Sequence, residues 1–95
     1  MAEIIWTRSA IKDLRDIHRF ISADSGYYAD RLIAALYNRV NVLTRYPRAG
    51  RMVPEKEDAS IRELIEGNYR IFYKVHSIDL VIILRIHHSS KEIKY

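Results

Sequence analysis

The chain has 95 residues and a formal net charge of +4 at pH 7; 48% of its residues are hydrophobic and 29% are charged. This size and balance predict one globular domain over residues 1–95 and argue against disorder except at the ends. Because the chain has no cysteine, disulfides and thiolate-bound metals are excluded, and the longest apolar run, residues 80–84, is too short to cross a membrane.

The N-terminal part of the chain predicts a short strand followed by a helix. Residues 3–6 suit a strand, and Thr7 or Ser9 can cap the helix, because a side-chain oxygen there accepts a hydrogen bond from a free backbone N–H group. The helix carries apolar residues at spacings of four, three and four, namely Ala10, Leu14, Ile17 and Ile21. This period predicts one apolar face and an opposite charged face.

A second helix is predicted after Asp24-Ser25-Gly26, which breaks the first helix and supplies a cap. Pro47 is expected to end it, because the residue before a proline is pushed out of the α region. Its apolar residues repeat the same spacing: Ala29, Ile33, Leu36, Val40 and Leu43. Two helices joined by so short a connection must be antiparallel and form a helical hairpin.

The rest of the chain predicts a loop and three consecutive antiparallel strands. Residues 48–58 are rich in Gly, Pro and charge without periodicity, which predicts the loop. Gly67-Asn68 then suits a two-residue turn, because Gly adopts positive φ without steric cost. Pairing outward from this turn gives the register Glu66–Tyr69, Leu64–Ile71, Glu63–Phe72 and Arg62–Tyr73.

Side chains alternate along these strands and so separate two faces of the sheet. The apolar face is expected to pack against the helical hairpin, with His88 at its margin; it collects Leu64, Ile71, Tyr73, Val75, Leu84 and Ile86. The opposite face is expected to stay open for a macromolecule. The order β-α-α-β-β-β therefore predicts an α+β fold, in which an antiparallel sheet has a helical hairpin on one side.

The open face is predicted to form a cationic groove with one imidazole, from Glu63, Arg70, Lys74, Arg85 and His87. In a site that cleaves RNA, His87 or a carboxylate would move protons while Arg70 and Arg85 stabilise the pentavalent phosphate. The alternative is a solvated face that is balanced by cross-strand ion pairs and has no catalytic role. These residues by themselves leave both interpretations open.

No metal or cofactor site is predicted. The four histidines, His18, His76, His87 and His88, lack the helical spacing or the cysteine partners of a zinc site. The sequence also has no Gly-rich phosphate loop and no nucleophile elbow.

Four tyrosines, Tyr27, Tyr28, Tyr37 and Tyr46, cluster on or beside the helical hairpin. They are expected in the core or at a protein interface, because stacking on bases needs aromatic side chains on the open sheet face.

In their order and spacing, these elements resemble the RelE/ParE superfamily of bacterial toxins from type II toxin–antitoxin operons. The resemblance covers nearly the whole chain. The matching segments include Trp6-Thr7, Gly50-Arg51, Val53-Pro54-Glu55, Ile61-Arg62-Glu63-Leu64, Gly67-Asn68-Tyr69-Arg70-Ile71 and His88 to Lys91.

The resemblance implies one of two activities. Toxins of the ParE branch bind and block DNA gyrase, whereas toxins of the RelE branch cleave messenger RNA on the ribosome. Cleaving relatives carry two lysines before the turn, at positions that align with Ile61 and Glu63, so the ParE branch is favoured. A non-enzymatic gyrase inhibitor is expected, with a degenerate toxin that only binds its antitoxin as a further alternative.

The resemblance also implies site residues for each activity. A ribonuclease would use Arg70 and Tyr95, or a loop glutamate, either Glu55 or Glu57, with Arg70 and His87. Together with Arg85 of the open face, the catalytic candidates are Arg70, Arg85, His87, Glu55 and Tyr95. A binding surface would comprise Arg62, Arg70, Lys74, His88 and Lys91.

The implied partners are a cognate antitoxin and DNA gyrase, or the ribosome and messenger RNA in the alternative. No cofactor, membrane or small-molecule substrate is expected. The basic charge suits an acidic amphipathic antitoxin segment, and a cytoplasmic location is expected because no secretory signal is visible.

Overall fold

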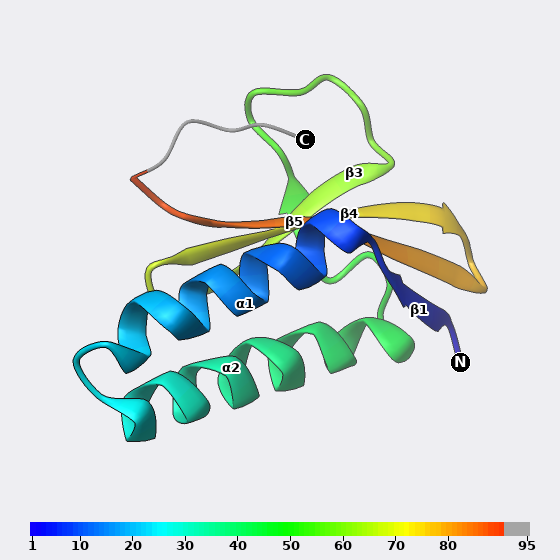
Figure 1. Cartoon of the computed structure of the whole chain (residues 1–95). Helices are drawn as coiled ribbons and strands as arrows, with labels where there is room; N and C mark the ends of the chain where they lie inside the picture. Colours follow the sequence, from blue (N-terminus) through cyan, green and yellow to red (C-terminus); the bar gives the residue numbers. More distant parts are fainter. Residues whose placement is uncertain (91–95) are drawn as a thin grey trace.

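The computed structural model describes residues 1–90, which form a layer of two helices against one face of a five-stranded sheet (Figure 1). The elements follow the order β1 (Glu3–Trp6), α1 (Arg8–Ser22), α2 (Gly26–Asn41), the 3-10 helix η1 (Val42–Thr44), β2 (Arg51–Met52), β3 (Ile61–Glu66), β4 (Tyr69–Ser77) and β5 (Leu80–His88). The predicted α+β fold with a helical hairpin on one side of the sheet is thus confirmed. No helix within residues 1–90 combines the length and apolar character that a membrane span requires.

The sheet differs from the predicted one in two respects. Its strand order is β1-β5-β4-β3-β2, and β1 pairs with β5 in parallel, so the sheet is mixed rather than antiparallel. The long connection from β1 through the helices makes this possible, because parallel neighbours need a crossover. The extra strand is β2, which lies within the predicted loop and pairs its two residues with β3.

Local signals at the start of each helix are confirmed. Thr7 caps α1 by accepting a hydrogen bond from the Ala10 N–H group, and Ser25 caps α2 through the Tyr28 N–H group. The end of α2 was predicted too late, since the helix stops at Asn41 and the chain continues as η1. There the Thr44 carbonyl accepts a hydrogen bond of 2.7 Å from the Ala2 N–H group, which ties this segment to the start of β1.

The β3–β4 hairpin has the predicted register. Glu66 lies opposite Tyr69 and Leu64 opposite Ile71 across the turn, in which Gly67 has a φ of 56°. A positive φ is strained for residues with a Cβ atom, which explains why glycine suits this position.

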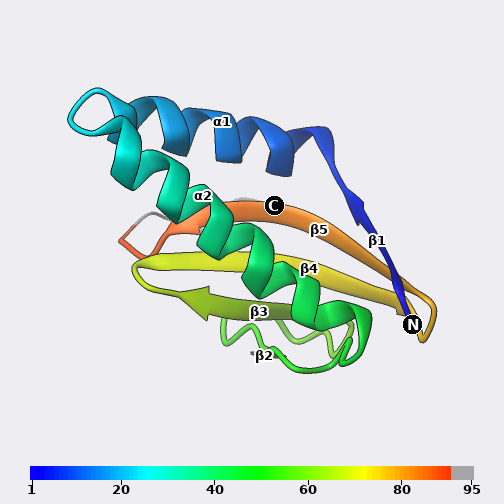
Figure 2. The same cartoon turned by 90° about the horizontal axis from the view of Figure 1, so that it is seen from below.

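The main core lies between the helices and the sheet. Figure 2 shows α2 running over β3 and β4 while α1 lies beside β5. The buried residues include Ala10, Leu36, Val40, Leu43, Leu64, Ile71, Tyr73, Val81, Ile83 and Ile86. The apolar positions of both predicted helices therefore do supply this core, with Leu14, Ile17 and Ile33 partly buried against it.

A bulge in β5 changes the predicted face of Leu84. Phe72 of β4 pairs with Arg85, but Tyr73 pairs with Ile83, so Leu84 has no partner of its own. Two residues therefore lie between the core residues Ile83 and Ile86. In a regular strand, only one residue separates neighbouring side chains on the same face. Leu84 consequently packs on the opposite side of the sheet from the helices. The regular alternation had predicted that it would face the helices.

Candidate functional site: the reverse face of the sheet

The reverse face, meaning the face of the sheet away from α1 and α2, is partly covered by the chain itself. Residues 51–60 lie on that side (Figure 1), and Val53, with 1% of its surface exposed, packs there against Ile61 and Phe72 in a second small core. The prediction of an open reverse face was therefore wrong in part. A strand of two residues and the loop after it have no periodicity by which their position could be recognised.

Glu63 is the most deeply buried charged residue on this face, with 0% of its side chain exposed. Its Oε1 accepts a hydrogen bond of 2.7 Å from Arg51 Nε, and its Oε2 accepts bonds of 2.8 and 2.5 Å from Arg70 Nε and Nη2. Arg51 reaches it because β2 places Arg51 directly opposite Glu63. A buried carboxylate is costly unless charged donors satisfy it, and here two guanidinium groups do so.

Arg70 is held from three sides. Beyond Glu63, its Nη1 and Nη2 donate to the two carboxylate oxygens of Glu55 at 3.1 and 3.0 Å, and its guanidinium carbon lies 4.8 Å from the centre of the Phe72 ring. The hydrogen bonds to Glu55 and then Glu63 raise the pKa of Arg70 above its ordinary value. The same pair keeps the pKa of the exposed Glu55 below its ordinary value.

Arg51, Glu55, Glu63 and Arg70 thus form one network, the carboxylate–arginine cluster, whose formal charges cancel. The cationic groove predicted for this face is therefore not what the structure shows. The predicted alternative, a face balanced by ion pairs, describes these four residues better.

Arg85 does not join the cluster. Its Nε and Nη2 donate to Asp13 of α1 at 2.8 and 3.0 Å, and Asp13 also accepts a hydrogen bond of 2.9 Å from the Ile86 N–H group. Arg85 does lie opposite Phe72 in the strand pairing, and it is the ion pair with Asp13 that holds its guanidinium against α1. The bonds to Asp13 also raise the pKa of Arg85.

The two adjacent histidines of β5 lie on opposite faces, as predicted. His87 is 7% exposed on the reverse face, directly opposite Arg70 in the strand pairing, and its ring lies 5.7 Å from that of Phe72. His88 packs against Tyr69 on the helix side, where its Nδ1 lies 2.7 Å from Ser90 Oγ. His88 also borders a cleft of about 790 Å³ between α1 and the end of β5.

The remaining predicted binding residues are dispersed. Arg62 donates a hydrogen bond of 2.9 Å to the Gly50 carbonyl. Lys74 lies near Asp58, whose pKa is lowered mainly by hydrogen bonds from Ser60 and to a smaller extent by Lys74. Two further predicted site residues, Lys91 and Tyr95, lie outside the described residues.

Three parts of this arrangement were not predicted: Arg51, Asp13 and the contact between Gly50 and Tyr73. The Tyr73 hydroxyl accepts a hydrogen bond of 2.8 Å from the Gly50 N–H group and so anchors the start of β2. A Cβ atom on Gly50 would lie 2.4 Å from the Glu63 carbonyl oxygen, which makes glycine necessary there. Gly50 belongs to a segment that matches the family, which indicated that the glycine matters. The sequence pattern did not indicate that its contact is with Tyr73.

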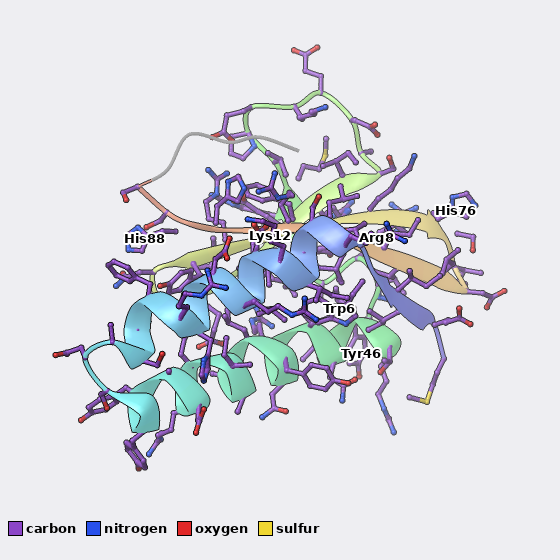
Figure 3. The ribbon with its side chains drawn as sticks, viewed as in Figure 1. Trp6, Arg8, Lys12, Tyr46, His76 and His88 are labelled. Carbon is purple, nitrogen blue, oxygen red and sulfur yellow. The ribbon has the colours of Figure 1, made fainter. Side chains whose placement is uncertain are left out.

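The four tyrosines on the helical hairpin are surface residues and not core residues. Tyr27, Tyr28, Tyr37 and Tyr46 are 64%, 66%, 56% and 63% exposed. Tyr37 stacks on Trp6 with ring centres 6.0 Å apart, and Figure 3 shows Tyr46 near the end of α2. Of the two interpretations of these tyrosines, only a protein interface remains open.

No group of three or more His, Cys, Asp or Glu side chains within residues 1–90 is arranged to hold a metal ion. Figure 3 shows His76 and His88 toward opposite ends of the sheet, so these two histidines do not converge.

Comparison with known proteins places the chain in a family. The model of the family described as the ParE toxin of the type II toxin–antitoxin system parDE matches residues 4–93. A relative, Toxin RelE2 of Caulobacter vibrioides, is 35% identical over 92 residues, which are 96% of this chain and 99% of the relative.

Two solved structures have the same fold. One comes from the chromosomal ParDE toxin–antitoxin system of P. aeruginosa: it is 25% identical, with a TM-score of 0.77, over 93% of this chain and 96% of the other. The other comes from the toxin–antitoxin complex RelBE2 of Mycobacterium tuberculosis: it is 26% identical, with a TM-score of 0.68, over 92% of this chain and 96% of the other. The chain therefore belongs to the ParE toxin family of type II toxin–antitoxin systems, within the RelE/ParE superfamily.

Proposed function

We propose that this toxin arrests growth by binding and blocking DNA gyrase in the cytoplasm, and that a cognate antitoxin from the same operon neutralises it. The match to the ParE family model supports the gyrase branch, as does the higher TM-score to the ParDE structure than to the RelBE2 structure. An antitoxin partner is supported by both solved structures, which come from toxin–antitoxin systems.

The carboxylate–arginine cluster is the structural observation that carries this proposal. Cleavage of an RNA backbone needs cationic groups that are free to stabilise the pentavalent phosphate. Here Glu63 stands where cleaving relatives carry a lysine, and it binds Arg70 instead of adding positive charge. The positive charge of the Arg70 guanidinium is thus already matched by carboxylates on both of its edges, Glu63 on the inner edge and Glu55 on the outer edge.

A second candidate function, ribosome-dependent cleavage of messenger RNA, is favoured by one arrangement. Glu55, Arg70 and His87 come together on the reverse face, because Arg70 binds Glu55 and pairs with His87 across the strands. These are the residue types of a ribonuclease that uses a loop glutamate, an arginine and a terminal histidine. The Toxin RelE2 relative is also named for the RelE branch.

Two assays on the same protein distinguish these functions. Freed from its antitoxin, the toxin is expected to inhibit supercoiling of relaxed plasmid by purified gyrase, and the reconstituted toxin–antitoxin complex is expected to leave supercoiling intact. Unchanged supercoiling at a large toxin excess would contradict the proposal. In cells, expression of the toxin alone is expected to cause filamentation and an SOS response.

Primer extension on translated messages tests the alternative. The proposal predicts intact messages during growth arrest. New cleavage sites that disappear in the Arg70→Lys variant, and persist in the Glu57→Gln variant, would establish the ribonuclease instead. Loss of any growth effect, with antitoxin binding retained, would indicate a degenerate toxin.

A further inference from the structure

The outer edge of Arg70 has the properties of a preformed site for an oxyanion. Glu63 fixes the guanidinium through Nε and Nη2, and Phe72 supports its face at 4.8 Å. Only 12% of the Arg70 side chain is exposed. Because the group is already ordered, a ligand on the outer edge would not bear the entropy cost of immobilising a long side chain.

The present occupant of this edge is a residue that can leave it. Glu55 binds Nη1 and Nη2 through both of its carboxylate oxygens, which shows that a planar two-oxygen anion fits the edge. Yet Glu55 is 52% exposed and lies outside regular secondary structure, between β2 and β3. A carboxylate that is half in water regains most of its hydration when it swings out, so its displacement costs little.

We propose that Glu55 is an exchangeable internal ligand, and that a carboxylate from an acidic side chain of the antitoxin replaces it on Arg70 in the complex. This inference rests on the antitoxin of the proposed function. An antitoxin carboxylate that is shielded from water at the interface binds Arg70 more strongly than the half-exposed Glu55 does. The net charge of +4 on the toxin favours the approach of an acidic segment.

The exchange also gives the loop after β2 a role. While Glu55 is bound, the loop is linked to Arg70 and, through Arg70, to the buried Glu63. When an antitoxin carboxylate takes over the site, this link breaks and the loop is released, whereas the inner bonds of Arg70 to Glu63 remain. In the carboxylate–arginine cluster, the exchange therefore changes the exposed bonds between Glu55 and Arg70 and leaves the buried ones in place.

The direct test is the affinity of the antitoxin for three forms of the toxin: wild type, Glu55→Gln and Glu57→Gln. Glu55→Gln removes the competing carboxylate and is expected to tighten antitoxin binding about two- to fivefold, the range that an exposed ion pair contributes. Glu57, an exposed residue of the same loop, is the matched control, and its variant is expected to bind like wild type. Equal affinities for all three forms would overturn the proposal.

A second measurement identifies the replacing group. Each Asp and Glu of the antitoxin is changed to its amide, and binding is measured to wild-type toxin and to Arg70→Lys, which keeps a charge but lacks the two-pronged edge. One antitoxin amide variant is expected to weaken binding to wild type more than tenfold and to have little effect on Arg70→Lys. Equal losses with both toxins for every antitoxin carboxylate would contradict the exchange.

A short single-stranded RNA serves as the probe for a phosphate ligand. If Glu55→Gln binds this RNA more tightly than wild type does, while its antitoxin affinity is unchanged, the site takes phosphate and the proposal is wrong. The gyrase assay is independent of these measurements, so failure of gyrase inhibition leaves the exchange standing. If wild-type toxin did not bind the antitoxin at all, both the exchange on Arg70 and the proposed neutralisation by an antitoxin would be wrong.

Discussion

The two faces of the sheet are stabilised by different kinds of interaction. On the helix side, the contacts are made by aliphatic residues such as Leu36, Leu64 and Ile83, which are almost completely buried. On the reverse side, a small core around Phe72 lies next to the buried Glu63, whose charge is matched by two arginines. One face therefore depends on shape and apolar area, and the other on the matching of charged donors and acceptors.

This difference bears on function. Apolar packing tolerates exchange of one aliphatic side chain for another, whereas a charged network depends on each of its members. A binding partner can therefore act on the reverse face by replacing a single charged group. Four variants, in order of decreasing expected effect, test this contrast.

Leu36→Asp tests the helix side and is expected to have the largest effect. Leu36 is 0% exposed within the main core, so the variant places a charge without a partner among aliphatic side chains. The free energy of unfolding is expected to fall by about 4 kcal/mol or more, a large part of the total stability of a small domain. Urea denaturation measures this loss, and Asn38→Asp, at an exposed position of α2, is the control.

Glu63→Gln tests the charge matching on the reverse side. It removes the carboxylate and leaves Arg51 and Arg70 facing a neutral amide, with Glu63 itself fully buried. The expected loss is about 3 kcal/mol, the cost of breaking a buried ion pair on one side. Denaturation of Glu57→Gln under the same conditions provides the comparison. If both variants melt like wild type, the network contributes nothing and the contrast between the faces fails.

Tyr73→Phe tests the connection between the two sides, because its ring lies in the main core and its hydroxyl accepts a hydrogen bond from the Gly50 N–H group. The variant leaves this buried N–H group without a partner and is expected to cost about 1–2 kcal/mol. Tyr46→Phe, at a residue that is 63% exposed, is expected to have no effect. A loss of equal size in both variants would show that the hydroxyl of Tyr73 is not special.

Glu55→Gln is expected to have the smallest effect on stability, and this effect is expected to depend on pH. Its pKa in the folded protein lies below the ordinary value of 4.5, mainly because of the hydrogen bonds from Arg70. The stabilisation is therefore present above that value and is lost as the pH falls through the lower folded-state pKa. Melting curves of wild type and Glu55→Gln are expected to converge as the pH falls below about 4.5. If the melting temperatures of wild type and variant differed by the same amount down to strongly acidic pH, the ion pair between Glu55 and Arg70 would not be the cause.

Much of the fold was predictable because it follows from local rules. Thr7 and Ser25 cap their helices, the apolar spacing selected the helical residues of the core, and Gly67-Asn68 set the register of the β3–β4 hairpin. Each of these features is decided within a few residues of sequence.

The errors occurred where distant segments decide the outcome. Arg85 was expected among the cationic residues of the reverse face, and it does lie opposite Phe72, but the carboxylate of Asp13 in α1 binds its guanidinium. Arg51 was treated as part of a loop because a two-residue strand shows no pattern, although its pairing with Glu63 completes the charged network.

The sequence alone was enough to predict the two helices, the central hairpin and the apolar face between them, because helix caps, turn residues and hydrophobic periodicity act over short distances. It also carried the family resemblance. Three features depend on contacts between distant segments: β1 joins β5 in parallel, residues 51–60 cover part of the reverse face, and Glu55 and Glu63 share Arg70. The partners of charged side chains depend on which groups lie close in space, and the nearest donor can be many residues away along the chain.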